Sequence, residues 1–138
     1  MTQASCKTTI NISADAIWQV ISEFSAADQY LAGVVTCTVE GAGVGALRTL
    51  TSADGSLVVE RLEALDGDTR QLSYALLTDT PFRNCLTTMA VLNLGPNQAE
   101  LEWWAIFEPD GIPASEAEQI LESAMSANCL ALKQFMER

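Results

Sequence analysis

The chain has 138 residues, of which 49% are hydrophobic and 18% charged, a composition typical of one globular domain and unlike that of a disordered segment. Its formal net charge of -11 disfavours nucleic acids and anionic membranes as partners, because both carry the same sign of charge. The absence of histidine excludes imidazole-based catalytic triads and histidine metal sites. We therefore expect no nucleic-acid partner, no metal site and no cofactor.

The sequence also predicts where the protein resides. No apolar run approaches the ~18 residues of a membrane span, and residues 1–9 lack the apolar core of a signal peptide. We expect a cytoplasmic protein without integral membrane association. The cysteines are widely separated and form no CxxC pair, so in a reducing compartment we expect four free thiols, mostly buried. They are Cys6, Cys37, Cys85 and Cys129.

The first third of the chain predicts a strand followed by short helices. Residues 4–12 are rich in threonine and isoleucine, which favour a strand. Ser13 then precedes an amphipathic stretch, residues 14–24, and is suited to cap it as a helix. A short second helix or turn follows at residues 28–30, before Gly33.

Six strands joined by turns follow in the middle of the chain. The glycine-rich residues 41–45 lack the lysine, the hydroxyl and the following helix of a phosphate loop, so a flexible strand connection is favoured. Successive hairpins predict an antiparallel sheet, and a sheet of this length must twist and curl. A loop with a proline is expected at residues 78–83. The strands are expected at residues 34–40, 46–51, 57–65, 71–78, 85–94 and 99–107.

A long helix is predicted at residues 113–136, beginning either at Pro113 or at a capping box of Ser115 and Glu118. Its inward stripe is rich in alanine, which fills little space, and Asn128 falls in the middle of it. A sheet gripping such a helix would leave a hole between them. The stripe comprises Ala117, Leu121, Ala124, Ala131 and Phe135, widened by Ile120, Met125 and Leu132.

These elements predict a single α+β domain over residues 1–138 with the helix-grip fold. We expect a curved seven-stranded antiparallel sheet, two short helices, and a long C-terminal helix over an internal cavity. Alternate residues of a strand face opposite sides, so the less charged set of each strand should face inward. This rule places Glu60 inside, because the opposite set carries Arg61 and Glu63.

For two strands the alternation does not decide which residues face inward. These are the strand that carries Arg48 and the strand at residues 85–94. Arg48 and Glu60 could pair inside, contact a ligand and water in an open cavity, or lie on the convex face if the parity is off by one. Asn128 could be a core amide bonded to the backbone. The residues expected to bind a ligand are Val35, Cys37, Arg48, Glu60, Leu62, Tyr74, Leu76, Cys85, Thr87, Met89, Trp103, Leu121, Ala124 and Asn128.

The strands and the final helix together resemble a known family. The segments VVTCTVE, GALRTLTSADG, VERLEALDGDTRQLSYALL, TPFRNCLTTMAVLNL and LEWWAIFEPDG are similar to the polyketide cyclase/dehydrase branch of the START/Bet v1-like superfamily (SRPBCC). The resemblance covers nearly the whole chain and implies the helix-grip fold. It also implies a hydrophobic or amphipathic ligand, with lipid binding and cyclase activity both found among members.

Within this superfamily the pattern is distantly similar to that of the plant abscisic-acid receptors. The resemblance implies that Glu60 lines a pocket and that Asn128 contacts water bound to a ligand. Arg48 matches an arginine on the strand before the gate loop of those receptors. Val35 stands where those receptors have a pocket lysine, and Cys85 replaces their pocket tyrosine. The proline of their gate and the histidine of their latch are also missing, so hormone binding is not implied.

Three functions follow as hypotheses. The first is binding or transport of a small hydrophobic or amphipathic molecule in the cavity. The second is a cyclase, dehydratase or lyase in which Glu60 acts as acid or base and Arg48 or Tyr74 holds an oxyanion. The third is an interaction module that uses an outward Trp104 and the loop at residues 79–83. An outward Trp104 is equally compatible with covering a neighbouring strand or a partner in a homodimer.

Overall fold

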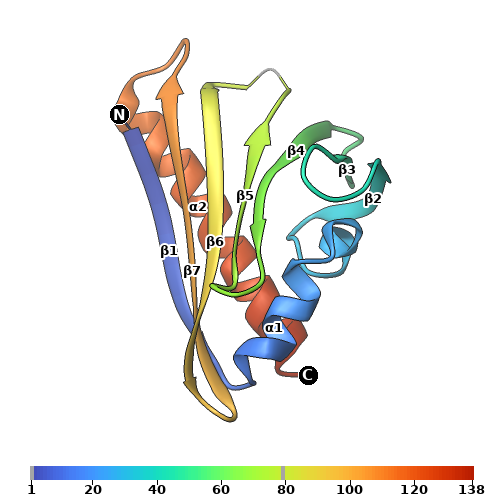
Figure 1. Cartoon of the computed structure of the whole chain (residues 1–138). Coiled ribbons are helices and arrows are strands. Elements are labelled where there is room, and N and C mark those ends of the chain that lie inside the picture. The colour runs from blue at the N-terminus through green and yellow to red at the C-terminus, as the bar shows by residue number, and fades with distance from the viewer. Residues whose placement is uncertain (1, 79) are drawn as a thin grey trace.

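The computed structural model describes residues 2–78 and 80–138, and it confirms the predicted helix-grip fold (Figure 1). An antiparallel sheet with strand order β1-β7-β6-β5-β4-β3-β2 curves around the long helix α2. The predicted loop at residues 78–83 includes Asp79, which lies outside the described residues. The elements are β1 (Thr2–Ile10), α1 (Ala14–Ile21), the 3₁₀ helix η1 (Phe24–Gln29), β2 (Val34–Glu40), β3 (Leu47–Ser52), β4 (Leu57–Asp66), β5 (Gln71–Leu76), β6 (Phe82–Gly95), β7 (Gln98–Pro109) and α2 (Ala114–Met136).

The short helices form where the sequence predicts them, with shifted ends. Ser13 caps α1 as expected, since its Oγ accepts a hydrogen bond of 3.2 Å from the amide of Ala16. The helix ends at Ile21 rather than at Phe24, and Phe24 instead begins η1. Phe24 and Tyr30 are both buried, so η1 covers part of the sheet's inner face.

The inner face of the sheet carries the core. On β7 the predicted inward set is buried, while Glu102 and Trp104 between them lie on the outer face. The same alternation buries Leu72 and Tyr74 on β5, and Leu62 on β4. The buried set on β7 consists of Leu101, Trp103, Ala105 and Phe107.

The long helix α2 packs mainly against β1 and, over a smaller area, against β7 (Figure 1). Pro113 precedes its first residue, and the capping box of Ser115 and Glu118 does not form. Its buried face is rotated from the predicted stripe, as the 46% exposure of Ile120 shows. The buried residues are Ala117, Met125, Cys129 and Leu132. Among the described residues, no helix combines the length and apolar character needed to cross a membrane.

The expectation of four free thiols is wrong. The sulfurs of Cys6 and Cys129 are bonded at 2.09 Å and join β1 to α2, while Cys37 and Cys85 are free. The pairing arises because Cys6 lies on the inner face of β1 and Cys129 on the buried face of the helix that packs against it. The two cysteines are 123 residues apart in the sequence, so no spacing pattern indicated that they pair.

The disulfide predicts a redox-dependent thiol count. In denaturant without reductant, a thiol reagent should label only Cys37 and Cys85, and after reduction all four cysteines. Replacing both Cys6 and Cys129 by serine should lower the free energy of unfolding by about 2–5 kcal/mol, because the bridge restricts the unfolded chain. The reagent count is read by mass spectrometry and the free energy by urea denaturation.

The control is Cys37→Ser, which should leave the effect of a reductant on stability unchanged. Labelling of all four cysteines in the unreduced protein would contradict the assignment.

Candidate ligand-binding cavity

A cavity of about 260 Å³ lies between α2 and the inner face of β3 to β7. The wall is completed by Val34 of β2, by Leu31 and Ala32 of the η1–β2 loop, and by Thr80 in the connection before β6. Most of the lining is apolar or aromatic. The lining residues are Leu31, Ala32, Val34, Leu50, Val58, Glu60, Tyr74, Leu76, Thr80, Phe82, Cys85, Thr87, Trp103, Leu121, Ala124, Met125 and Asn128.

The structure gathers many of the residues predicted to bind a ligand around this cavity, and their role in binding stays a prediction. Those that line it are Glu60, Tyr74, Leu76, Cys85, Thr87, Trp103, Leu121, Ala124 and Asn128. The predicted residues that do not line it are Val35, Cys37, Arg48, Leu62 and Met89.

The prediction that Val35 lines the cavity is wrong, because its side chain is 56% exposed and is not part of the lining. The pairing of β2 with β3 shifts between Val34 and Thr36, and this irregularity makes Val34 the inward residue. Cys37 faces inward but lies under η1, where its thiol is 3.7 Å from the carbonyl oxygen of Phe24. Leu62 and Met89 are buried in the core away from the cavity.

Sequence reasoning missed the part of the lining that comes from connecting segments. Leu31, Ala32 and Thr80 lie outside any periodic pattern, so no spacing signalled them. Phe82 is the first residue of β6, which begins before the strand predicted at residues 85–94. The other additions, Leu50, Val58 and Met125, belong to elements whose inward sets had been recognised, and Val34 depends on the irregular pairing of β2.

Arg48 and Glu60 form a buried ion pair at one end of the cavity. They lie directly opposite each other on β3 and β4, and both face inward, which excludes the convex-face alternative. Nε and Nη2 of Arg48 contact the same oxygen, Oε1 of Glu60, at 2.8 and 2.7 Å. Glu60 lines the cavity, whereas Arg48 lies behind it and is only 2% exposed.

The rest of the Arg48 guanidinium contacts the backbone of Phe24 and two aromatic rings. Its Nη1 donates a hydrogen bond of 3.3 Å to the carbonyl oxygen of Phe24. The guanidinium carbon lies 4.1 Å from the ring centroid of Phe24 and 4.8 Å from that of Tyr74, in cation–π contacts. The guanidinium therefore joins η1, β3, β4 and β5 around one charge.

Burial and pairing act in opposite directions on these two groups. Burial lowers the pKa of Arg48, but the Glu60 carboxylate and the Tyr30 and Tyr74 hydroxyls more than offset this, so its pKa is raised. Burial raises the pKa of Glu60, and the Arg48 guanidinium opposes that rise only in part. The carboxyl group at the cavity wall is therefore a weaker acid than an exposed glutamate.

Other polar groups of the cavity are neutral. The indole Nε1 of Trp103 donates to the hydroxyl oxygen of Tyr74 at 3.2 Å. Cys85 is a buried free thiol 3.9 Å from the hydroxyl of Thr87, and burial raises its pKa. Nucleophilic chemistry at this thiol is disfavoured because the thiolate is the reactive form.

Asn128 holds a connecting segment to α2. Its Oδ1 accepts a hydrogen bond of 2.9 Å from the backbone amide of Ala32, and both residues line the cavity. The sequence alternative of an amide bonded to the backbone is therefore confirmed for Oδ1, although the residue lies at the cavity edge rather than in the packed core.

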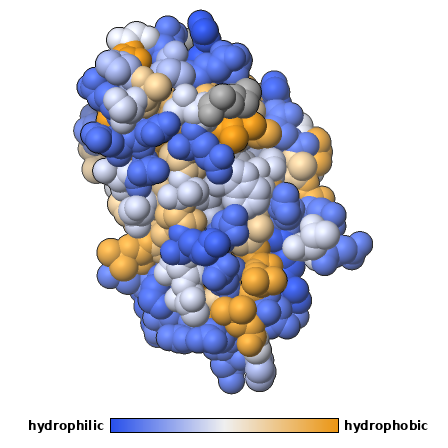
Figure 2. All heavy atoms as spheres, turned by 90° about the vertical axis from the view of Figure 1, so that its left-hand side faces the viewer, coloured by the Kyte–Doolittle hydropathy of each residue, from blue (hydrophilic) through white to orange (hydrophobic). Residues whose placement is uncertain are grey.

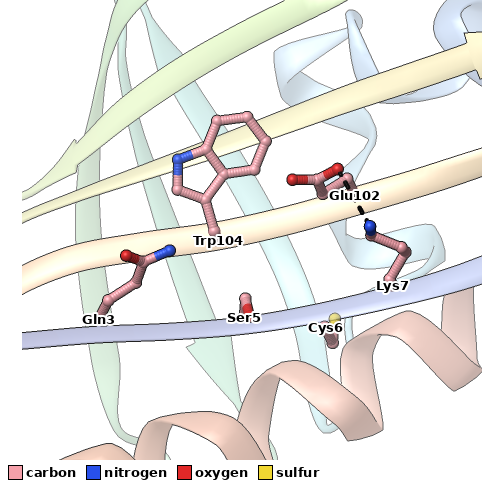
Figure 3. Close-up of a pocket in the computed structure, with 6 residues that line it drawn as sticks. All are labelled: Gln3, Ser5, Cys6, Lys7, Glu102 and Trp104. Atoms are coloured by element: carbon pink, nitrogen blue, oxygen red, sulfur yellow. Dashed lines mark ion pairs between the residues drawn. The ribbon is translucent and has the colours of Figure 1, made fainter.

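A second hollow, of about 500 Å³, lies on the outer face of β1 and β7 (Figure 3). It is walled by these two strands alone, with Gln3, Ser5, Lys7 and Trp104 among its residues. The ammonium of Lys7 is 3.7 Å from the carboxylate of Glu102, so its charge is already paired. This side of the molecule is mostly hydrophilic with small separate apolar patches (Figure 2). Among the described residues, only β1 and β7 line this hollow, whereas the inner cavity is enclosed by the sheet, α2 and a loop and is the better candidate for a small molecule.

Among the described residues, no group of three or more Cys, Asp or Glu side chains is placed to hold a metal ion. The cavity therefore offers one buried carboxyl group, neutral donors and acceptors, and apolar walls.

Comparisons with known proteins agree with this geometry. The family described as polyketide cyclase / dehydrase and lipid transport matches residues 1–138. No curated protein matches the chain. Protein XoxI from Bacillus cereus superposes with a TM-score of 0.90 at 25% identity, covering 99% of this chain and 96% of its own.

Two more distant structures share the fold. A START superfamily protein from Mycobacterium smegmatis has a TM-score of 0.85 at 15% identity, covering 99% of this chain and 98% of its own. The Zhui aromatase/cyclase from Streptomyces sp. R1128 has a TM-score of 0.78 at 16% identity, covering 97% of this chain and 90% of its own.

The tyrosines give a pH prediction. Burial, and after it the neighbouring Glu60, raises the pKa of Tyr74, and burial raises that of Tyr30, both from an ordinary value of 10.0. Between pH 10.0 and the raised values, the unfolded chain loses tyrosine protons that the folded chain keeps. The tyrosine contribution to stability is therefore full below pH 10.0 and falls as the pH rises further.

The measurement is the near-ultraviolet absorbance of tyrosinate during alkaline titration, recorded with circular dichroism. Tyrosinate should appear together with cooperative unfolding. Tyr30→Phe and Tyr74→Phe assign the two contributions. A gradual titration of both tyrosines near their ordinary pKa in the folded protein would refute the burial argument.

Proposed function

We propose that this chain, which belongs to the family described as polyketide cyclase / dehydrase and lipid transport, binds a small molecule. The molecule is hydrophobic or amphipathic and lies between α2 and the sheet. The membership and the shared fold confirm the START/Bet v1-like identification made from the sequence. The observation that carries the proposal is a mostly apolar cavity beside the hydrophobic core, with few polar groups on its wall.

The size of the cavity sets the scale of the guest. An apolar cavity of about 150 Å³ accommodates one benzene ring. A volume of about 260 Å³ therefore suits a molecule of one or two rings, or a short branched chain. Native mass spectrometry of the purified protein tests whether such a molecule is retained.

Location and assembly stay predictions. A cytoplasmic site was expected because the sequence lacks a membrane span and a signal-peptide core. The Cys6–Cys129 disulfide is more typical of proteins that mature in an oxidising environment. A homodimer through the outer face near Trp104 is compatible with the half-exposed indole there, and size-exclusion chromatography with light scattering tests it.

A cavity-blocking substitution tests the binding proposal directly. Ala124 lines the cavity and is also solvent-exposed, so a larger side chain there fills the cavity or closes its mouth. Naphthalene should stabilise the wild type by about 1.4 kcal/mol at about ten times its Kd, because it binds only the folded state. Ala124→Trp should abolish that gain, as measured by the shift of Tm on adding naphthalene.

Ala127→Trp is the matched control. It makes the same substitution one helical turn away, at an exposed position outside the cavity lining, and should keep the full response to naphthalene. Equal responses in the two variants would place the naphthalene elsewhere and count against the proposal.

A second candidate function is an enzyme of the cyclase, dehydratase or lyase kind. One observation favours it, the buried carboxyl group of Glu60 at the wall of an apolar cavity, whose raised pKa suits an acid or base. The hydroxyl of Tyr74 lies in the same wall and could hold a developing negative charge. Arg48 is less suited to that role, because it lies behind the wall and its donors are engaged.

Glu60→Gln separates the two functions. For an enzyme, turnover of a compound identified by mass spectrometry should fall by about 10²–10⁴-fold, because the amide cannot exchange a proton. For a carrier, naphthalene binding should change little. Unaltered turnover in the Gln variant would eliminate Glu60 as the acid or base.

A further inference from the structure

Glu60 is the only charged residue among the described residues that line the cavity. Its carboxylate oxygen Oε1 accepts both contacts from Arg48, which leaves Oε2 free of that partner. Since Glu60 itself faces the cavity, a guest meets an acceptor of negative character rather than a cation. This arrangement disfavours a guest that carries its own negative charge.

Arg48 cannot turn to meet an anionic guest without losing its present contacts. Nε and Nη2 are on Glu60, and Nη1 donates to the backbone of Phe24. The rings of Phe24 and Tyr74 cover the guanidinium. A carboxylate entering the cavity would give up its hydration without gaining a cation from this pair.

The remaining wall favours a flat guest with a hydrogen-bond donor. The aromatic side chains Tyr74, Phe82 and Trp103 line the cavity. Offset or edge contacts between such rings and an aromatic guest add to the apolar burial. A hydroxyl on the guest could donate to the Glu60 carboxylate, and hydrogen bonds to a charged acceptor are stronger than neutral ones.

We propose that the guest is an uncharged aromatic alcohol or phenol of one or two rings, and that the Glu60–Arg48 pair selects it over the corresponding carboxylate. This inference rests on the proposed function, because it names the ligand class of the same cavity. Selection arises from the placement of the two charges, because the Glu60 carboxylate lies at the cavity wall and the Arg48 guanidinium lies behind it.

Three probes of one ring system test the selection: 2-naphthol, naphthalene and 2-naphthoate. Isothermal titration calorimetry is run at a pH where the naphthol is uncharged and the naphthoate ionised. We expect 2-naphthol to bind at least about tenfold more tightly than 2-naphthoate, and several-fold more tightly than naphthalene. Saturation by 2-naphthol should also suppress binding of the other two, which places them in one cavity.

Glu60→Gln should shrink or invert the preference of naphthol over naphthoate, because it removes the negative charge and leaves Arg48 uncompensated near the guest. The matched control is Glu63→Gln, which removes the same charge from the outer face of β4 and should keep the wild-type ratio. Because a Gln at position 60 could disturb folding, the wild-type series stands as a test by itself.

The outcomes separate the two proposals. If none of the three probes binds, the proposed binding function fails. If naphthoate binds as tightly as naphthol or more tightly, the binding function survives and the inferred selection is overturned. A naphthol preference that Glu63→Gln reduces as much as Glu60→Gln does would also overturn it, since the overall charge would then be the cause.

Discussion

The buried ion pair between Arg48 and Glu60 is the constraint on which the rest of the site depends. Each charge would be costly to bury alone, so the two strands that carry them must pair with these residues opposite each other. A slip of one residue between β3 and β4 would separate the charges and reverse the faces of a strand. The pair therefore fixes a register in addition to placing a carboxyl group.

The same pair organises the surroundings of the cavity. Arg48 reaches the carbonyl oxygen of Phe24, which holds η1 against the inner face of the sheet. Its contact with the ring of Tyr74 orients a side chain that also accepts from Trp103. One guanidinium thus connects the 3₁₀ helix with β3, β4 and β5, and Tyr74 extends the connection to β7.

The cavity itself follows from where α2 packs. The helix is bonded to β1 through the Cys6–Cys129 disulfide and buries Leu132 completely, so it leans toward the β1 and β7 side of the curved sheet. Toward β4 and β5 it presents the small Ala124 and the polar Asn128. Asn128 holds the η1–β2 loop over this region through Ala32, which walls the void without filling it.

Sequence reasoning recovered what depends on local pattern. Turn chemistry and strand alternation predicted the antiparallel order and the inward faces of Glu60 and Tyr74, because neighbouring residues determine both. Val35 was misplaced because a pairing irregularity interrupts the alternation of β2, and nothing in the residues marks it. The disulfide between Cys6 and Cys129 and the loop residues of the cavity depend on contacts between segments far apart in sequence, which composition and spacing do not encode.

The position of the carboxyl group relates the two candidate functions to each other. Under either proposal the charged side chain at the cavity wall is Glu60, since Arg48 lies behind it. Binding alone requires that the guest keep its proton, whereas acid–base catalysis requires that the proton move. Burial raises the pKa of Glu60, and the Arg48 guanidinium opposes that rise only in part. The two proposals therefore differ in one step, the transfer of a proton between Glu60 and the guest.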